Sequence, residues 1–355
     1  MSLRFYPLTV HSVSTETREA YTINFTNPDR ELFAYKAGQY LTLKVQVGDE
    51  LLRRSFSLSS APHEELLSVT IKALPDGRVS QHLRRTLEPG DRVEVLPPMG
   101  KFFVAPEPMH AKHYVLIGCG SGITPLMGML KAILHLEGDS RITLLYGNRS
   151  EATTIFRQQL EELAARHPKR LAVTHVLSQP EGPTAHVGRL EGPLLKSLIQ
   201  QAQQQHRLPI GYYLCGPEGM MASAKAVLKE LGVPDTVVHT EYYSAPVADA
   251  SEAETEAEGL EYEIVTQNVT VLLEGTETVV TVPPDQSILH AALKRGLDPP
   301  YACEEGVCCT CRALLLEGMV AMDEREGLSD EELAAGYILT CQSHPLTADV
   351  KLRYG

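Results

Sequence analysis

The pattern of hydrophobic and polar positions changes twice along the 355-residue chain. Up to about residue 104, short segments such as residues 40–47 and 67–74 alternate apolar with polar positions, and Gly, Pro and Asp turns separate them. Alternation with a period of two buries one face of a strand and exposes the other. The first region is therefore predicted to be an antiparallel β-barrel or sandwich.

From residue 105 to about residue 245, continuous apolar runs alternate with helical stretches. Four of these runs are predicted to be buried parallel strands: residues 113–118, 141–146, 171–177 and 210–215. A set of apolar residues at helical spacing follows the first run and predicts one face of an amphipathic helix: Ile123, Leu126, Met127, Leu130 and Ile133. The second region is therefore predicted to be an α/β domain with an open parallel sheet.

The third region begins with an acidic stretch. Residues 246–260 are acidic, rich in small residues and without apolar periodicity, which predicts a linker. Residues 261–355 contain two candidate strands, a candidate helix at 287–295, a cysteine-rich loop and further short strands. The chain is therefore predicted to fold as three domains, at 1–104, 105–245 and 261–355.

Composition and charge narrow the class of protein. Hydrophobic residues make up 43% and charged residues 22% of the chain, which is typical of globular proteins. The formal net charge of −13 argues against nucleic acid and anionic membranes as primary partners. Residues 246–355 carry 21 acidic and 6 basic residues, so the acidity lies in the C-terminal third. Without a membrane-length apolar run or an export signal, we expect a cytoplasmic protein.

Five of the seven cysteines lie between residues 303 and 341. The spacing Cys303-x4-Cys308-x2-Cys311, followed by Cys341, matches the plant-type [2Fe–2S] arrangement of four thiolate ligands. A zinc site would prefer two Cys-x2-Cys pairs, and only one is complete here. We interpret the four cysteines as iron ligands, with zinc and plain buried thiols as the alternatives.

The residues around these cysteines resemble the plant-type ferredoxins. The likeness covers Pro300–Cys311 and two flanking segments, Ser287–Leu293 and Leu316–Val320. It implies a β-grasp-like α+β domain around the cluster. The sequence departs from the family at Cys309, where Gly, Ala or Ser is usual, and a small filling side chain is the simplest role for it.

Two short motifs lie in the first region. Arg54-Ser-Phe-Ser57 ends a candidate strand, and Gly77-Arg-Val-Ser80 precedes a helical stretch. In the second motif a Gly turn and a Ser N-cap would leave backbone N–H groups free to bind phosphate. Each motif alone also fits an ordinary strand end or helix start.

A third motif, Gly118-Cys-Gly-Ser-Gly-Ile-Thr-Pro125, follows the first predicted parallel strand. Its glycines would let the backbone approach a pyrophosphate, and Pro125 suits the first turn of a helix. The motif lacks the G-x-G-x-x-G spacing, so a purely structural turn is the alternative.

Taken in order, residues 5–245 resemble the ferredoxin–NADP reductase superfamily, including Cys215-Gly-Pro-Glu-Gly-Met after the fourth apolar run. The resemblance implies FAD in the first domain and a nicotinamide nucleotide in the second, with Phe56 packing on the flavin where Tyr is commoner. It implies catalytic roles for Ser57, Cys215 and Glu241. It also implies cofactor binding by Arg54, Ser55, Phe56, Ser57, Lys72, Gly77, Arg78, Val79, Ser80, Gly120, Thr124, Pro125, Arg149, Cys215, Gly216, Pro217 and Tyr243.

The charge of the residues that follow the second predicted parallel strand helps to distinguish NADPH from NADH as the nucleotide. A carboxylate there would bind ribose hydroxyls, whereas an arginine accommodates a 2′-phosphate. The strand runs into Arg149 without an acid, which favours NADPH. Gln179 stands where plant-type reductases tend to have a second cation, so NADH also remains possible.

The three predicted cofactors have complementary chemistry. NADPH gives up two electrons as a hydride, the cluster accepts one at a time, and a flavin does both. The domain order resembles the reductase subunits of phenylacetyl-CoA epoxidases, which implies electron delivery to a di-iron oxygenase component. The alternatives are the reductase of a steroid or aromatic-ring hydroxylase, and a redox-sensing protein without turnover.

Overall fold

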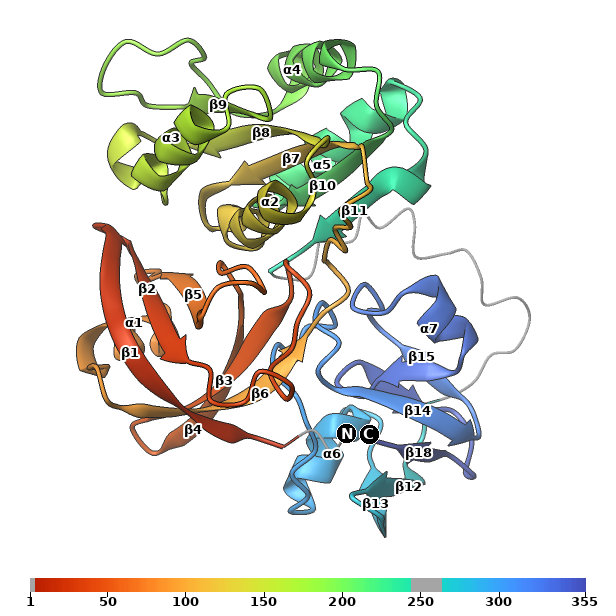
Figure 1. The fold of residues 1–355 in the computed structure, drawn as a ribbon. Helices are drawn as coiled ribbons and strands as arrows, with labels where there is room; N and C mark the ends of the chain where they lie inside the picture. The colour runs from red at the N-terminus through yellow and green to blue at the C-terminus, as the bar shows by residue number, and fades with distance from the viewer. Residues whose placement is uncertain (1–3, 244–263) are drawn as a thin grey trace.

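The computed structural model describes residues 4–243 and 264–355. Three large sheets divide these residues, and each belongs to a separate part of the chain (Figure 1). The predicted linker at 246–260 lies outside the described residues, as do the adjoining ends of the two domains beside it.

The first sheet is antiparallel, with strand order β4-β3-β6-β1-β2-β5. Its strands are β1 (Tyr6–Thr17), β2 (Ala20–Thr26), β3 (Tyr40–Val47), β4 (Glu50–Ser57), β5 (Leu66–Lys72) and β6 (Arg92–Met99). A bridge between Leu58 and Val69 joins the end of β4 to β5, so the two edges of the sheet meet there. Helix α1 (Arg78–Thr86) buries Val79 and Leu83 in the same core. The predicted antiparallel barrel is confirmed.

The second sheet is parallel throughout, with order β11-β10-β7-β8-β9. Its strands are β7 (His113–Cys119), β8 (Arg141–Asn148), β9 (Leu171–Leu177), β10 (Ile210–Cys215) and β11 (Val238–Glu241). Helices α2 (Ile123–Leu136) and α3 (Arg157–Arg166) pack in one core, and α4 (Gly192–Gln205) and α5 (Glu218–Glu230) in another. Three short 3-10 helices complete this part: η1 (Gly120–Gly122), η2 (Glu151–Thr153) and η3 (Asp235–Val237). The four predicted parallel strands are confirmed, and β11 is an additional one.

Helix α2 differs from the predicted amphipathic helix with one apolar face. Eleven of its 14 residues are buried. The barrel covers the face that the sheet leaves free: a Cβ added to Gly128 would lie 2.9 Å from the carbonyl oxygen of Leu58 and 2.8 Å from that of Ser60. Because the helix lies between two domains, it is apolar almost all round.

The C-terminal sheet has the order β13-β12-β18-β14-β16, with β12 and β18 parallel. Its elements are β12 (Gln267–Leu273), β13 (Thr276–Val282), α6 (Ile288–Lys294), β14 (Arg312–Glu317), α7 (Asp330–Ala334), β16 (Tyr337–Leu339) and β18 (Lys351–Arg353), and β15 (Val320–Met322) pairs separately with β17 (Ser343–Pro345). The Ser287 hydroxyl accepts a hydrogen bond from the His290 N–H and caps α6, which packs on the sheet. This is the β-grasp-like arrangement that the resemblance to plant-type ferredoxins implied.

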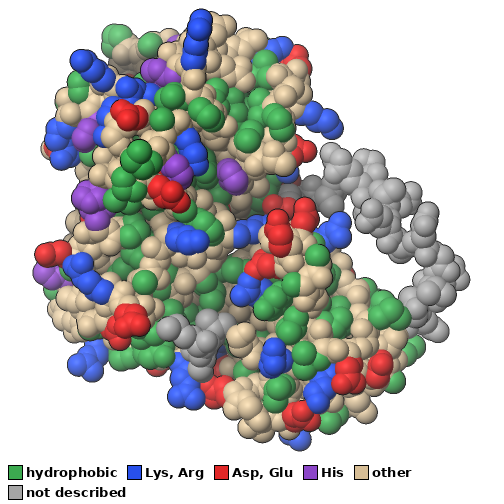
Figure 2. Space-filling model, turned by 45° about the vertical axis from the view of Figure 1, so that its right-hand side comes forward, with side chains coloured by type: hydrophobic (Ala, Val, Ile, Leu, Met, Phe, Trp, Pro, Cys, Tyr) green, Lys and Arg blue, Asp and Glu red, His purple; other side chains and the backbone are tan. Residues whose placement is uncertain are grey.

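Charged groups of both signs lie on the surface. On the face drawn in Figure 2, hydrophobic side chains are scattered among acidic and basic ones. Among the described residues, every helix is too short or too polar to cross a membrane.

Candidate functional site

A cavity of about 490 Å³ opens where the barrel, the α/β domain and the cysteine loop meet. This volume lies within the range of small-molecule and cofactor pockets, roughly 300–1,000 Å³. We call this cavity the interdomain cleft. It is lined by Tyr40, Arg54–Ser57, Thr70–Lys72, Leu74, Asp76–Ser80, Ser121, Thr124, Glu241–Tyr243, Cys303, Glu305, Val307 and Cys308.

The end of β4 brings the first predicted motif into the cleft. Arg54, Ser55, Phe56 and Ser57 all line it, as does Lys72 at the end of β5. The Arg54 guanidinium donates a hydrogen bond to the carbonyl oxygen of Arg53 and is otherwise exposed at the rim. Two cations and an aromatic ring that line one cavity suit a ligand that combines phosphates with a planar ring system.

The second motif lies at the start of α1, and Gly77, Arg78, Val79 and Ser80 all line the cleft. The predicted Ser80 N-cap is wrong: Gly77 is the N-cap residue, and Ser80 lies in the first turn with its hydroxyl bonded to the Gly77 carbonyl oxygen at 3.1 Å. A Cβ at Gly77 would lie 2.2 Å from that hydroxyl, so a larger residue here would force the Ser80 side chain to move. Unpaired backbone N–H groups at this helix start can still bind phosphate.

Three segments converge at the inner end of the cleft. The Ser57 hydroxyl donates to the Glu241 carboxylate at 3.2 Å, and Tyr243 shares a hydrogen bond of 2.9 Å with Thr124. Burial raises the pKa of the Glu241 carboxyl to about 8, although the Ser57 hydrogen bond opposes the shift. The structure thus places a carboxyl group that keeps its proton near neutral pH against the predicted flavin edge.

Cys215 lies directly behind this group and is completely buried. Burial, followed by the nearby Glu241 carboxyl, raises the pKa of its thiol well above the usual value. The carbonyl oxygen of Cys215 would lie 2.0 Å from a Cβ at Gly122, so the turns after β7 and β10 pack without room for a side chain. The thiol is therefore neutral and fixed in position.

The predicted nicotinamide motif follows β7, and Gly216 and Pro217 follow the neighbouring strand β10. Strands β8 and β9 extend the sheet on one side of β7, and β10 and β11 extend it on the other. Ligands of open α/β sheets bind at the carboxyl ends of the strands where the order reverses in this way. Thr124 reaches the cleft directly, whereas Gly120, Pro125, Gly216 and Pro217 lie outside its lining.

Arg149, after β8, lies away from the cleft and bridges two domains. Its guanidinium donates to both carboxylate oxygens of Glu19, at 2.6 and 2.7 Å, and Lys72 lies 3.6 Å from the same carboxylate. The hydrogen bond from Arg149 lowers the pKa of Glu19. The residue predicted to hold a 2′-phosphate thus has an anionic partner from the barrel.

The four predicted cluster ligands form two pairs. A hydrogen bond with Cys308 lowers the pKa of Cys303 to about 6, and a hydrogen bond with Cys311 lowers that of Cys341. In the described residues, no three His, Cys, Asp or Glu side chains converge on a single metal position. Two neighbouring thiol pairs fit the predicted cluster, in which two irons share four thiolate ligands.

The backbone of the cysteine loop is shaped around the thiols. The Glu305 N–H donates to the Cys303 sulfur at 3.4 Å. Gly306 has a φ of +77°, and a Cβ there would lie 2.6 Å from Glu324 and 2.9 Å from Gln342. The left-handed backbone and the close packing of Glu324 and Gln342 both favour glycine at this position of the cysteine loop.

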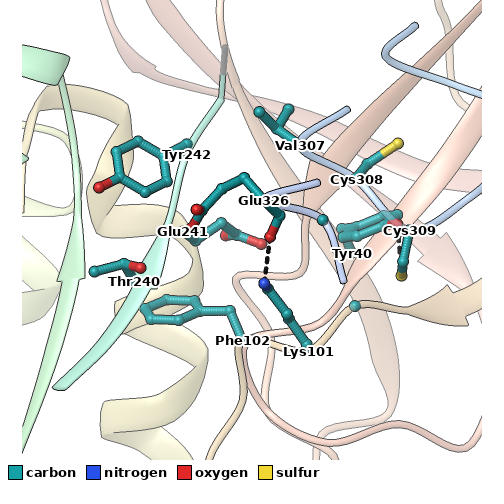
Figure 3. A pocket seen from close by; sticks show the side chains of 12 residues that line it. Tyr40, Lys101, Phe102, Thr240, Glu241, Tyr242, Val307, Cys308, Cys309 and Glu326 are labelled. Carbon is teal, nitrogen blue, oxygen red and sulfur yellow. Dashed lines mark hydrogen bonds between the residues drawn. The ribbon is translucent and has the colours of Figure 1, made fainter. Parts of the chain in front are cut away.

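Sequence reasoning missed Tyr40, which connects the cleft with the cysteine loop. Its ring is buried, and its hydroxyl lies 3.1 Å from the Thr310 hydroxyl and 3.5 Å from the Cys309 sulfur. Figure 3 shows Tyr40 beside Cys308 and Cys309, with Glu241 and Tyr242 on the opposite side. Tyr40 belongs to an ordinary alternating strand, so no local motif could have identified it.

Lys101, which follows β6, also contacts the C-terminal domain. Its ammonium group donates to the carbonyl oxygen of Glu326 (Figure 3). It also donates to the carbonyl oxygen of Leu328 at 3.0 Å. Tyr40 therefore contacts the cysteine loop directly, and Lys101 contacts the separate segment 326–328 of the C-terminal domain.

Three family models match successive parts of the chain. An oxidoreductase FAD-binding domain matches residues 7–104, an oxidoreductase NAD-binding domain matches residues 116–226, and a 2Fe-2S iron-sulfur cluster binding domain matches residues 271–346. These matches confirm the predicted FAD, nicotinamide nucleotide and [2Fe–2S] cluster, in the predicted order.

Relatives match over nearly the whole chain. The chain is 39% identical over 352 residues to one of the subunits of the 1,2-phenylacetyl-CoA epoxidase of Escherichia coli (strain K12), covering 98% of this chain and 96% of the relative. It is 34% identical over 359 residues to the ferredoxin reductase component of 3-ketosteroid-9-alpha-monooxygenase from Rhodococcus rhodochrous, again covering 98% and 96%.

Among solved structures, phthalate dioxygenase reductase has the same modular fold. It aligns with a TM-score of 0.60 and 24% identity over 99% of this chain and 98% of its own.

Proposed function

This chain belongs to the family of FAD- and [2Fe–2S]-containing reductase components of oxygenases, and we propose that its acceptor is the di-iron oxygenase component of a phenylacetyl-CoA epoxidase. It is an NAD(P)H-dependent oxidoreductase that passes electrons through FAD to a [2Fe–2S] cluster and on to an oxygenase. The 39% identity to the epoxidase component, against 34% to the steroid monooxygenase reductase, supports this acceptor.

One structural observation supports the proposed electron route from FAD to the cluster. Ser57 and Glu241 line the same interdomain cleft as Cys303 and Cys308. FAD, when bound, accepts two electrons at once and releases them singly. A single cavity shared by the flavin residues and two cluster ligands lets that exchange occur within one chain.

We assign roles to residues of the cleft and to neighbouring residues as part of the proposal. Arg54, Lys72 and the start of α1 at Gly77–Ser80 bind the FAD phosphates, while Ser55 and Phe56 contact the flavin. Ser57, Glu241 and Cys215 surround its reacting edge, with Tyr243 beside them. Cys303, Cys308, Cys311 and Cys341 ligate the irons.

The nucleotide site is assigned in the same way. The turn from Gly120 through Thr124 and Pro125, together with Gly216 and Pro217, lies at the carboxyl ends of β7 and β10 and binds the nicotinamide nucleotide. Domain boundaries at 104, 245 and 260 remain part of the proposal.

Electron acceptance tests the proposed function. The purified, FAD- and iron-loaded protein should oxidise NADPH when supplied with the oxygenase component of a phenylacetyl-CoA epoxidase, and phenylacetyl-CoA should be epoxidised. The oxygenase component of a 3-ketosteroid 9α-monooxygenase is the matched comparison. Faster turnover with the steroid enzyme would reverse the assignment of acceptor, and a flavin-loaded protein inert to both nicotinamides would reject reductase activity altogether.

Arg149 tests the nucleotide preference. We expect Arg149→Ala to raise KM for NADPH more than KM for NADH, because only NADPH carries the 2′-phosphate that a guanidinium binds. Steady-state kinetics with ferricyanide as acceptor measure both constants. Equal effects on the two nucleotides would remove Arg149 from this role.

A further inference from the structure

Arg53 and Arg54 are adjacent residues of β4, and their side chains lie on opposite faces of the strand. Arg54 lines the interdomain cleft, whereas Arg53 is 3% exposed and lies against the segment that precedes the first cluster cysteine. Successive side chains of a strand point to opposite faces, so one pair of residues reaches both the flavin site and the ferredoxin domain. We infer that Arg53 is a positioning residue for electron transfer, which holds the ferredoxin domain so that Cys303 and Cys308 stay at the cleft.

The contacts of Arg53 cross between domains. One terminal nitrogen donates to the carbonyl oxygen of Pro299 at 2.9 Å, and the other pairs with Asp298. The guanidinium carbon lies 4.3 Å from the centroid of the Tyr301 ring and 4.9 Å from that of Phe5. The guanidinium is thus packed between one ring from each domain while it hydrogen-bonds to the ferredoxin domain.

The chemistry of this contact specifically suits arginine. A planar guanidinium stacks on aromatic rings and donates in two directions at once, which a lysine ammonium on a flexible stem does not do. Asp298 is 68% exposed, so solvent screens its side of the ion pair. The Pro299 carbonyl oxygen and the Tyr301 ring are further partners of the guanidinium, and a buried arginine without these partners would be costly.

The position of this contact links it to the electron route. Tyr301 is two residues before Cys303, and Arg53 is one residue before Arg54. Both Cys303 and Arg54 line the interdomain cleft. Because so few residues separate the Arg53 contact from these lining residues, a shift at the contact changes the distance between the flavin site and the cluster loop.

Two other barrel residues also contact the ferredoxin domain. Tyr40 reaches Thr310, and Lys101 reaches the carbonyl oxygen of Leu328. Loss of Arg53 alone should therefore misplace the ferredoxin domain rather than release it. The inference rests on the proposed electron route and adds no redox step: NAD(P)H remains the reductant and the oxygenase the final acceptor.

The experiment compares Arg53→Met with Lys44→Met in the full-length protein loaded with FAD and cluster. Lys44 is the matched control because its ammonium lies 5.0 Å from the same Phe5 ring, but it pairs with Glu94 inside the barrel, at 3.2 Å. Stopped-flow absorption separates flavin reduction by NADPH from the later reduction of the cluster. Amide hydrogen exchange at Asp298, Tyr301 and Ala302 reports the contact independently of activity.

In Arg53→Met we expect cluster reduction to slow about tenfold or more, because small misplacements of reacting groups cost large factors in rate. Flavin reduction and ferricyanide turnover should stay within about twofold, and amide exchange at Asp298, Tyr301 and Ala302 should accelerate. Lys44→Met should change none of these. Arg53→Lys should fall between the two, because it keeps the charge and loses the planar fork.

Tyr301→Leu approaches the same contact from the ferredoxin side and leaves the barrel unaltered. It should slow cluster reduction, and the double variant should be no slower than Arg53→Met alone, since both remove one contact. Unchanged cluster reduction in Arg53→Met, or effects of the two substitutions that multiply, would overturn the inference. A wild-type protein that NADPH does not reduce would instead reject the proposed function.

Discussion

The fold strongly raises the pKa of the Glu241 carboxyl, which lies at the end of the cleft where we place the reacting edge of the flavin. Burial raises the pKa of its carboxyl to about 8, so the group is protonated at neutral pH and becomes a carboxylate as the pH rises through about 8. The neutral form is the one that the fold accommodates. The associated stability is therefore fully present below the usual glutamate pKa of 4.5 and is lost as the pH rises from there to about 8.

The same titration should govern the rate of flavin reduction. A negative charge on Glu241 opposes the arrival of negative charge beside it, so we expect reduction by NADPH to slow as the pH rises through about 8. Glu241→Gln cannot ionise and should lose this inflection, as measured by stopped-flow reduction between pH 6 and about 9.5. Glu65→Gln, at an exposed acid of the barrel, is the control and should keep it. An inflection that survives in Glu241→Gln would assign it to another group.

Glu19 should set how readily Arg149 binds a nucleotide phosphate. Its carboxylate holds the guanidinium through two hydrogen bonds, so a 2′-phosphate must compete with it. We expect Glu19→Gln to lower KM for NADPH by about twofold to fivefold, the size of a partly exposed ion pair, with KM for NADH unchanged. A fall in both constants would show that the pair acts on domain placement and not on phosphate recognition.

Residues predicted from the sequence share one property: their role depends on near neighbours in the chain. The spacing of Cys303, Cys308 and Cys311 is such a pattern, and the loop around Gly306 supports it. Tyr40, Arg53 and Glu19 act through partners more than 100 residues away. Nothing in their local sequence distinguishes them from ordinary strand and turn residues, so only the folded chain identifies them.

Among the elements, helix α2 shows how contact with a neighbouring domain can favour glycine inside a helix. Glycine inside a helix is ordinarily less stable than alanine by about 1 kcal/mol. At Gly128, however, a Cβ would lie under 3.0 Å from two barrel carbonyl oxygens. The glycine therefore permits close approach of the α/β domain to the barrel.

We expect Gly128→Ala to destabilise the protein by about 1–3 kcal/mol, because backbone atoms cannot move aside as a flexible side chain can. Gly219→Ala in α5 is the matched control. A Cβ there would meet only the Glu191 carboxylate at 3.6 Å, and the substitution should be neutral or stabilising by up to about 1 kcal/mol. Thermal unfolding with FAD bound measures both. Equal stability of the two variants would mean that the domains separate freely at Gly128.

Long apolar runs such as 141–146 were predicted correctly because a buried strand has few alternatives. Strand β11 has four residues, none of them fully buried, and gives no such signal. The N-cap of α1 was misassigned because Ser80 has the residue type of a cap, whereas the turn geometry selects Gly77. Element type was thus predictable where burial dictates it, and element ends were not.

For the whole molecule, the sequence predicted which domains are present but not how they meet. The cluster loop faces the flavin site because Arg53, Tyr40 and Lys101 of the barrel each contact the ferredoxin domain. These are single polar contacts scattered over two parts of the chain. Their geometry depends on both folded domains at once, which no pattern along one segment encodes.

Charge is distributed unevenly over the domains, and this should affect delivery to an acceptor. Residues 264–355 carry 14 acidic and 6 basic residues, whereas residues 1–245 carry 24 and 26. An acidic ferredoxin domain attracts an acceptor with a basic surface and repels an anionic one. Raising the ionic strength from about 0.01 M to about 0.15 M shortens the screening length from about 30 Å to about 8 Å and weakens both effects.

We therefore expect the rate of reduction of basic cytochrome c, at a subsaturating concentration, to fall several-fold over this range of salt. Ferricyanide is an anion, so its reduction should stay constant or rise, and it controls for salt effects on nucleotide binding and on flavin reduction. Steady-state rates with the two acceptors at matched NADPH measure the difference. If the reduction rates of both acceptors fell in parallel, the salt effect would lie at the nucleotide site, where salt would screen the attraction between Arg149 and the 2′-phosphate.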